Sequence, residues 1–411
     1  MASRESSGEL FVAVRRHLRV ASVWTLLFAL ALVSGGGCTG SSAKPSNAQS
    51  TGSMNVAAGS GGNGIPNAPV TTGATTAMQQ TGGAMTGGVV ISDTGGAVQG
   101  SGGATGGSVD ISDASTTFGG YPLLEAGQIG APVMISDAFM LAESPLWDPC
   151  NHQLLFTDVT ASTINALGAD GQISVYASNT NNANGIAWDI DGSLILAQMG
   201  GSPGHIARMD SSKNIQTLEP AGSPTLHTPD DTIVRSDGTI YFTDGDFYPI
   251  GNILGFSSVL PIYMLKPGGA SLVNVGSVSG PNGIEFSPDE KTLYVSAYGG
   301  GTVASFAVAA DGSLTPGSAA ASGLTHPDSL CLDAAGNLYV GVSTGLQVLR
   351  PDGAPITLIP ISSSSGTTSC GFGGDDGKTL YISAWTTLWK VEGMPIPGQD
   401  WLVNRDRLGC N

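Results

Sequence analysis

Asn-Gly-Ile-Glu-Phe at residues 282–286, followed by Leu-Tyr-Val-Ser at 293–296, is the stretch that decides the fold, because five other stretches repeat its pattern. Each copy has a polar first residue, several mostly apolar ones, a turn rich in Asp and Gly, and an alternating apolar segment. The six copies begin at Glu143, Asn184, Asp230, Asn282, Asp328 and Ser369. Successive starts are 41, 46, 52, 46 and 41 residues apart.

Repeats of this length, built from short strands and turns, are typical of a β-propeller with about four strands in each blade. Helical signals are weak throughout, because Gly and Pro are frequent and no window keeps a 3.6-residue period. A solenoid of the same period would need atypical capping repeats, and none is evident. The sequence therefore predicts an all-β, six-bladed propeller over residues 121–411.

Residues 1–38 have the pattern of an export signal. Three arginines precede the charge-free segment 20–33, which is short for a membrane anchor, and small residues lead to Cys38. This end resembles the lipobox of bacterial lipoproteins and implies lipidation of Cys38, although Gly35 stands where that pattern prefers Leu. We expect an exported protein, either a lipoprotein at the cell envelope or a secreted form, with membrane contact only through this anchor.

Residues 39–120 form a low-complexity stretch rich in Gly, Ser and Thr, with no Leu and one aromatic residue between 39 and 118. Such a stretch cannot offset its chain entropy by burying apolar side chains, so we expect a disordered linker. In an oxidising compartment the four remaining cysteines can form disulfides in three connectivities, and the sequence leaves the choice open. These cysteines are Cys150, Cys331, Cys370 and Cys410.

The overall charge and hydropathy exclude two classes of function. With 15 basic and 32 acidic residues, the formal net charge is −17, which is unfavourable for binding nucleic acid. No apolar run reaches the roughly 20 residues that span a bilayer, so the chain is not a multi-pass membrane protein.

The first residue of every repeat carries a side-chain oxygen, and equivalent positions in a propeller lie at one height around the central channel. Carboxylates that converge there repel one another unless a cation or protons intervene. Since neither His nor Cys occurs at these positions, the cation should be hard, with Ca²⁺ first and Mg²⁺ or Mn²⁺ next. A hydrated polar channel without a specific ion is the alternative.

The chain resembles the gluconolactonase/regucalcin family (senescence marker protein type), on four motifs in a fixed order. These are Glu-Ser-Pro-Leu-Trp-Asp at 143–148, Thr-Pro-Asp-Asp at 228–231, Pro-Asn-Gly-Ile-Glu-Phe-Ser-Pro-Asp at 281–289 and Pro-Asp-Ser-Leu-Cys-Leu-Asp at 327–333. The similarity covers roughly residues 130–392. It implies a six-bladed propeller that hydrolyses sugar lactones with a divalent metal.

By this resemblance Glu143, Asn282 and Asp328 fall on the family's metal ligands, and Asp328 also falls on its catalytic acid/base. The fourth family ligand is an Asn, whereas this chain has Asp230, which adds one negative charge. The implied ion is Ca²⁺ or another divalent cation such as Mg²⁺, Mn²⁺ or Zn²⁺. Three residues become candidates for substrate binding: Asn184, His227 and Ser369.

The resulting hypothesis is a metal-dependent hydrolase of a sugar lactone or related ester, with Asp328 as general base. Covalent catalysis is disfavoured because the chain has no GxSxG elbow. One alternative is a non-catalytic, surface-tethered calcium-binding propeller that binds a glycan or protein partner. Another is an enzyme for aryl esters or organophosphates. Closed propellers are often self-sufficient, so we expect a monomer.

Overall fold

The computed structural model describes residues 117–118, 120–201, 203–247, 257–363 and 365–410. The predicted export signal with Cys38 and nearly all of the predicted linker lie outside these residues. Just before the repeats, β1 (Thr117–Phe118) pairs with β2 (Tyr121–Pro122), and η1 (Ala126–Gln128) follows. Within the described ranges, no helix has the length and apolar character needed to cross a membrane.

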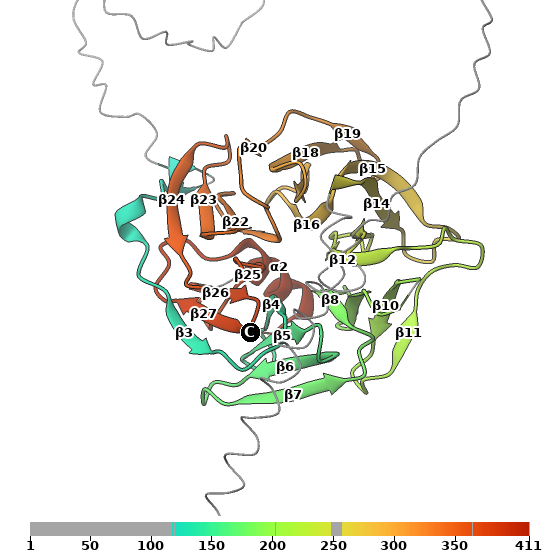
Figure 1. The fold of residues 1–411 in the computed structure, drawn as a ribbon, viewed down its shortest axis with the longest axis horizontal. Helices are drawn as coiled ribbons and strands as arrows, with labels where there is room; N and C mark the ends of the chain where they lie inside the picture. Colours follow the sequence, from blue (N-terminus) through green and yellow to red (C-terminus); the bar gives the residue numbers. More distant parts are fainter. Residues whose placement is uncertain (1–116, 119, 202, 248–256, 364, 411) are drawn as a thin grey trace, which may run out of the picture. The chain divides into compact units, whose positions relative to one another are not determined.

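One antiparallel sheet forms from each repeat, and the six sheets stand like blades around a central axis (Figure 1). The ring closes because β3 (Val133–Ser136), which precedes the first repeat, pairs with β27 (Thr387–Val391) of the last blade. A closed ring of this kind is not a solenoid, and the predicted six-bladed propeller is confirmed.

The first three blades each contain four consecutive strands, with the first strand nearest the axis (Figure 1). Blade 1 has β4 (Ala142–Asp148), β5 (Gln153–Asp158), β6 (Thr163–Leu167) and β7 (Ile173–Ser178). Blade 2 has β8 (Ala183–Trp188), β9 (Leu194–Gln198), β10 (His205–Met209) and β11 (Ile215–Thr217). Blade 3 has β12 (Thr228–Val234), β13 (Ile240–Gly245), β14 (Val259–Leu265) and β15 (Val273–Ser279).

The last three blades follow the same order, with one extra strand in blade 4 and the N-terminal β3 completing blade 6. Blade 4 has β16 (Pro281–Phe286), β17 (Thr292–Ala297), β18 (Thr302–Val308), β19 (Leu314–Pro316) and β20 (Ala321–Ser322). Blade 5 has β21 (Leu330–Leu332), β22 (Leu338–Val342), β23 (Gly345–Leu349) and β24 (Pro355–Pro360). Blade 6 has β25 (Ser369–Gly373), β26 (Thr379–Ala384), β27 and β3.

The hydrophobic core lies between neighbouring blades. Leu155 of blade 1, for example, shares one buried cluster with Leu194 and Leu196 of blade 2. The equivalent tryptophans Trp147 and Trp188 are both buried, and Trp188 Nε1 donates a 2.9 Å hydrogen bond to the Trp147 carbonyl. Their equivalent places in the repeat predict this blade-packing role, which the structure confirms.

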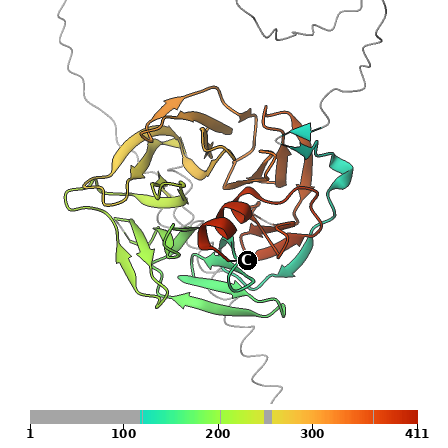
Figure 2. The same cartoon turned by 180° about the vertical axis from the view of Figure 1, so that it is seen from behind.

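Helix α2 (Gln399–Leu408) is an element that the sequence pattern misses. It crosses the middle of the ring in Figure 2. Its buried residues are Gln399, Trp401 and Asn404, a mostly polar set, so no apolar period marks it in the sequence. The helix forms here because neighbouring blades supply its partners: both Arg407 Nη atoms donate 2.8 Å hydrogen bonds to main-chain carbonyls at the ends of β8 and β12.

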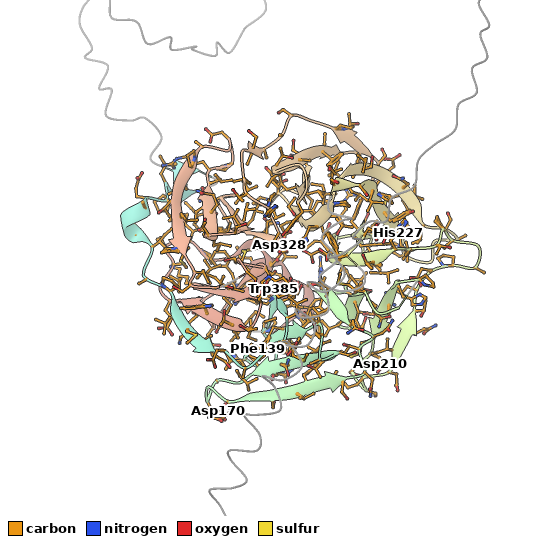
Figure 3. The ribbon with its side chains drawn as sticks, viewed as in Figure 1. Phe139, Asp170, Asp210, His227, Asp328 and Trp385 are labelled. Atoms are coloured by element: carbon orange, nitrogen blue, oxygen red, sulfur yellow. A yellow bond between two sulfur atoms is a disulfide. The ribbon has the colours of Figure 1, made fainter. Side chains whose placement is uncertain are left out.

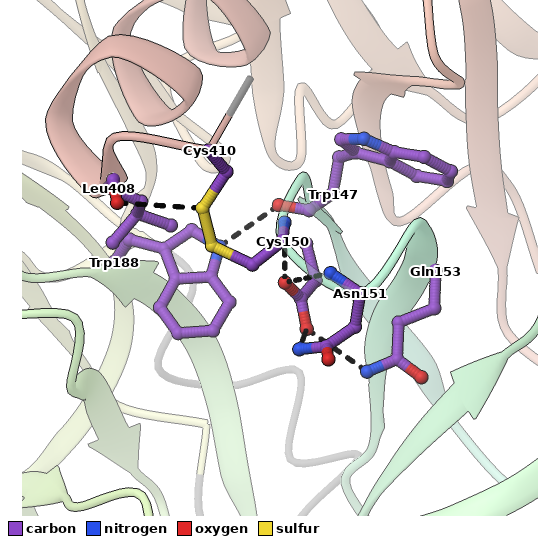
Figure 4. The surroundings of a disulfide bond; sticks show 8 residues. Trp147, Cys150, Asn151, Gln153, Trp188, Leu408 and Cys410 are labelled. Atoms are coloured by element: carbon purple, nitrogen blue, oxygen red, sulfur yellow. Dashed lines mark hydrogen bonds between the residues drawn. A yellow bond between two sulfur atoms is a disulfide. The ribbon is translucent and has the colours of Figure 1, made fainter.

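Two disulfides settle which of the three connectivities the chain adopts. Cys150, in the β4–β5 turn, pairs with Cys410 immediately after α2 (Figure 4). Cys331 in β21 pairs with Cys370 in β25, which joins the inner strands of blades 5 and 6. The first bond therefore ties the C-terminal helix to blade 1, and the second lies inside the ring.

Candidate active site in the central channel

The predicted site residues lie where the inner strands begin, and the backbone there departs from regular pairing. In each of four blades, one extra residue is inserted in the inner strand relative to its partner. These bulges fall between Glu143 and Leu146, Ala183 and Ile186, Pro229 and Thr232, and Pro281 and Ile284. Four of the six repeat-start residues therefore lie at or inside a bulge. A bulge turns side chains away from the regular alternation of a strand.

The structure brings the predicted acidic ligands into electrostatic contact. Glu143 and Asp230 are 6% and 4% exposed, whereas Asp328 is partly exposed. Burial raises the pKa of the Glu143 carboxyl well above its usual range, and the nearby Asp328 and Asp230 raise it further. Burial likewise raises the pKa of Asp230, with Asp328 adding to the shift. Burial and mutual repulsion therefore disfavour the simultaneous ionisation of these carboxyls, and a nearby positive charge would relieve that repulsion.

Hydrogen bonds hold two of the carboxyl groups. Asn184 Nδ2 donates to Asp230 Oδ1 at 2.7 Å. Burial raises the pKa of Asp328 to about 8, although a hydrogen bond from the Asn282 side chain acts in the opposite direction. The residues predicted as ligands from four different blades are thus linked, either by charge or by hydrogen bonds.

The remaining two candidates for substrate binding differ in position. His227 stands just before β12, away from the middle of the ring where Asp328 lies (Figure 3). Its side chain is 54% exposed, and its Nδ1 is 3.2 Å from Asp244 Oδ2. Ser369 is 2% exposed, and its carbonyl accepts a 3.3 Å hydrogen bond from Ser383 Oγ. His227 is therefore open to solvent, whereas Ser369 is buried.

Asp231 is a site residue that sequence reasoning did not single out. It is partly exposed, follows Asp230, and its charge raises the pKa of Glu143, Asp230 and Asp328. Burial raises its own pKa to about 6, and a hydrogen bond from Ser329 opposes this shift. The signal available in the sequence was the doubled Asp at 230–231, of which only the first was assigned a role.

The other end of the channel is covered by α2. Between the helix and the inner strands lies a cavity of about 60 Å³, lined in part by Asp231, Glu285, Asp400 and Arg407. Burial raises the pKa of Glu285, and the neighbouring Asp400 carboxyl raises it further through its charge and a shared hydrogen bond.

The donor set at the channel fits a hard divalent cation in its chemistry. The four predicted ligands offer only carboxylate and amide oxygens, and their mutual repulsion favours a positive charge between them. In the described part of the chain, however, no three His, Cys, Asp or Glu side chains are gathered closely enough to hold a metal ion. The metal site therefore stays a prediction from residue chemistry.

A family model described as SMP-30/Gluconolactonase/LRE-like region matches residues 141–386, which include all six repeat starts. The chain belongs to this family. Its relatives include a gluconolactonase of Zymomonas mobilis subsp. mobilis, 24% identical over 64% of this chain and 82% of that protein. Regucalcin of Xenopus laevis is 25% identical over 67% of this chain and 91% of that protein.

Solved structures agree with this assignment. The structure of a gluconolactonase from Xanthomonas campestris is 29% identical and covers 65% of this chain and 89% of that chain, with a TM-score of 0.58. Another, described as a putative gluconolactonase, is 24% identical over 68% of this chain and 95% of that chain, with a TM-score of 0.58, and supports the fold alone. The family model ends before α2, so the helix lies outside the matched region.

Proposed function

We propose that the protein is a lactonase that hydrolyses a sugar lactone or a related ester with the help of a divalent cation in its central channel. Family membership supports the reaction class, since this chain covers 82% and 89% of two relatives that are named gluconolactonase. The observation that carries the proposal is the electrostatic contact among Glu143, Asp230 and Asp328 at the end of the channel where the inner strands begin. An all-oxygen, acidic site of this kind suits a hard cation and a carboxylate base.

The ligands would be Glu143, Asp230, Asn282 and Asp328, and Ca²⁺ is the first candidate. A bound divalent cation would polarise the lactone carbonyl and keep the surrounding carboxyls ionised. Asp328 is the carboxylate among them that is partly exposed, so it can reach a water molecule beside the substrate.

Asp328 would take a proton from the attacking water as oxygen bonds to the carbonyl carbon. It would return that proton to the ring oxygen when the carbon–oxygen bond of the lactone breaks. The hydrogen bond from Asn282 would fix the orientation of the Asp328 carboxylate. His227, with its exposed imidazole, and the buried Asn184 and Ser369 would contact polar groups of the substrate.

We also propose that the protein is exported, with lipidation at Cys38, and acts as a monomer. The two disulfides support export, because such bonds persist mainly in oxidising compartments.

The test is hydrolysis of glucono-δ-lactone by the full-length protein, followed by acid release, with EDTA and then with Ca²⁺ restored. We expect activity that EDTA removes and Ca²⁺ recovers. Asp328→Asn should abolish turnover while the circular dichroism spectrum is unchanged. The control is Asp333→Asn, which alters a buried carboxylate at the other end of the same inner strand and should stay active.

Three results would count against the proposal. Full activity in Asp328→Asn would exclude its role as base, and activity that survives EDTA would exclude the cation. A protein that binds Ca²⁺ but hydrolyses no lactone, aryl ester or phosphotriester would be a binding propeller instead.

A further inference from the structure

We propose that Asp231 is a positioning residue for the reaction: its carboxylate holds the inner strands that carry Asn282 and Asp328 at a fixed separation. This inference rests on the proposed lactonase function and adds a role for a side chain that neither the repeat pattern nor the family resemblance assigned.

The first observation is a hydrogen bond that skips a blade. Ser329 Oγ donates to Asp231 Oδ2 at 2.7 Å, although the two residues are 98 positions apart. Asp231 belongs to β12 of blade 3, whereas Ser329 precedes β21 of blade 5. Most contacts in a propeller join neighbouring blades, so this bond ties together two inner strands that have another strand between them.

The strand between them is held by the same residue. The backbone N–H of Ile284, in β16 of blade 4, donates to the Asp231 carboxylate. Thr243 Oγ1 accepts a 3.1 Å hydrogen bond from the Asp231 backbone and donates one of 2.6 Å to the Asn282 carbonyl. Ile284 is two residues after Asn282, and Ser329 is next to Asp328, so both contacts lie beside proposed ligands.

Close backbone packing shows that this arrangement leaves little freedom. A Cβ atom at Gly185 would lie 2.6 Å from Asp231 Oδ1, and one at Gly283 would lie 2.5 Å from Ser329 Cα. Both distances are far below van der Waals contact, so only glycine fits at these two positions. The Asp231 carboxylate of blade 3 therefore lies against elements from blades 2, 4 and 5.

The oxygen atoms of Asp231 are already used within the protein. Oδ2 accepts from Ser329, and Oδ1 accepts from the Thr232 backbone at 2.9 Å. These bonds tie the Asp231 carboxylate to its own strand and to Ser329, which is next to the proposed ligand Asp328, and this is the arrangement of a positioning residue. Loss of that support would shift Asp328 relative to Asn282, and a displacement of about 1 Å at a reacting group can cost on the order of 100-fold in rate.

The experiment uses four variants of the full-length protein: Asp231→Ala, Asp231→Asn, Ser329→Ala and the double variant Asp231→Ala/Ser329→Ala. We expect Asp231→Ala to lower kcat for glucono-δ-lactone about 100-fold and Ser329→Ala to lower it about 10-fold. In both variants KM should change less than threefold. Asp231→Asn should recover most of kcat, because its amide can still hydrogen-bond the Ser329 hydroxyl. The double variant should be no worse than Asp231→Ala, since both changes break one interaction.

The matched control is Asp148→Asn, which alters a buried carboxylate at the end of β4 that accepts hydrogen bonds from Asn151 and from Gln153, the first residue of β5. It should leave kcat unchanged. Parent-like kcat in Asp231→Ala, or additive losses in the double variant, would overturn the positioning role while leaving the lactonase proposal intact.

Ca²⁺ affinity, measured by calorimetry on the same proteins, separates the two proposals. If the parent protein hydrolyses no lactone, the lactonase proposal fails. The single and double variants are then compared by their Ca²⁺ affinities instead of by kcat. Non-additive weakening of Ca²⁺ binding by the Asp231→Ala and Ser329→Ala changes would then support the positioning role. Additive or absent effects, or a parent that binds no Ca²⁺, would refute it.

Discussion

The disulfide between Cys150 and Cys410 should contribute more to stability than its peripheral place in the fold suggests. It links positions 260 residues apart, whereas Cys331 and Cys370 are separated by only 39. In the chain-entropy description, the lower entropy of the cross-linked unfolded chain adds about 5.5 kcal/mol to the unfolding free energy for the longer loop. For the shorter loop it adds about 4 kcal/mol. Both are upper values, since strain and residual unfolded structure reduce them.

The test is equilibrium urea unfolding of the full-length protein and of Cys150→Ala/Cys410→Ala, followed by tryptophan fluorescence. We expect the variant to lose about 3–5 kcal/mol of unfolding free energy. Because α2 lies at the opposite end of the channel from the strand starts, lactone turnover at low temperature should be unchanged. A loss of unfolding free energy below about 2 kcal/mol would refute the argument from loop length. A large loss of kcat in the folded variant would show that the position of α2 does affect the candidate site.

Three further predictions concern charge. In EDTA the free energy of unfolding should fall as pH rises from about 4 to about 8. The reason is that folding raises the pKa of Asp328 from 3.8 to about 8. The protonated Asp328 therefore stabilises the folded state fully below pH 3.8, and this stabilisation is lost as pH rises to about 8. Urea titrations across this range check it, and a flat profile would contradict it. Asp230→Asn should weaken Ca²⁺ binding about tenfold by removing one carboxylate, as calorimetry would show; unchanged affinity would mean that Asp230 is not a ligand. Arg407→Met should cost about 3 kcal/mol, because two carbonyls at the ends of β8 and β12 lose their charged donor, and an unchanged urea midpoint would show that these bonds contribute little.

The sequence repeat was sufficient to predict most of the fold. A polar residue followed by an inner strand, a turn and an apolar strand is local information, and six copies at near-equal spacing allow few architectures other than a closed ring. For the same reason the six repeat starts were found without a structure. The closing strand β3 and helix α2 were not, because each is stabilised by residues far away in the chain and has no repeat partner.

The candidate site divides in the same way. The repeat alone predicts that Glu143, Asp230, Asn282 and Asp328 occupy equivalent positions, because its period aligns them with one another. Tertiary structure alone decided that Asp231 reaches Ser329 across a blade, that α2 covers one end of the channel, and that Cys150 pairs with Cys410. Those contacts join segments 98 to 260 residues apart. Such contacts depend on how closely the blades of the closed ring approach one another. A local pattern of residues does not give the distance between segments that are far apart in the sequence.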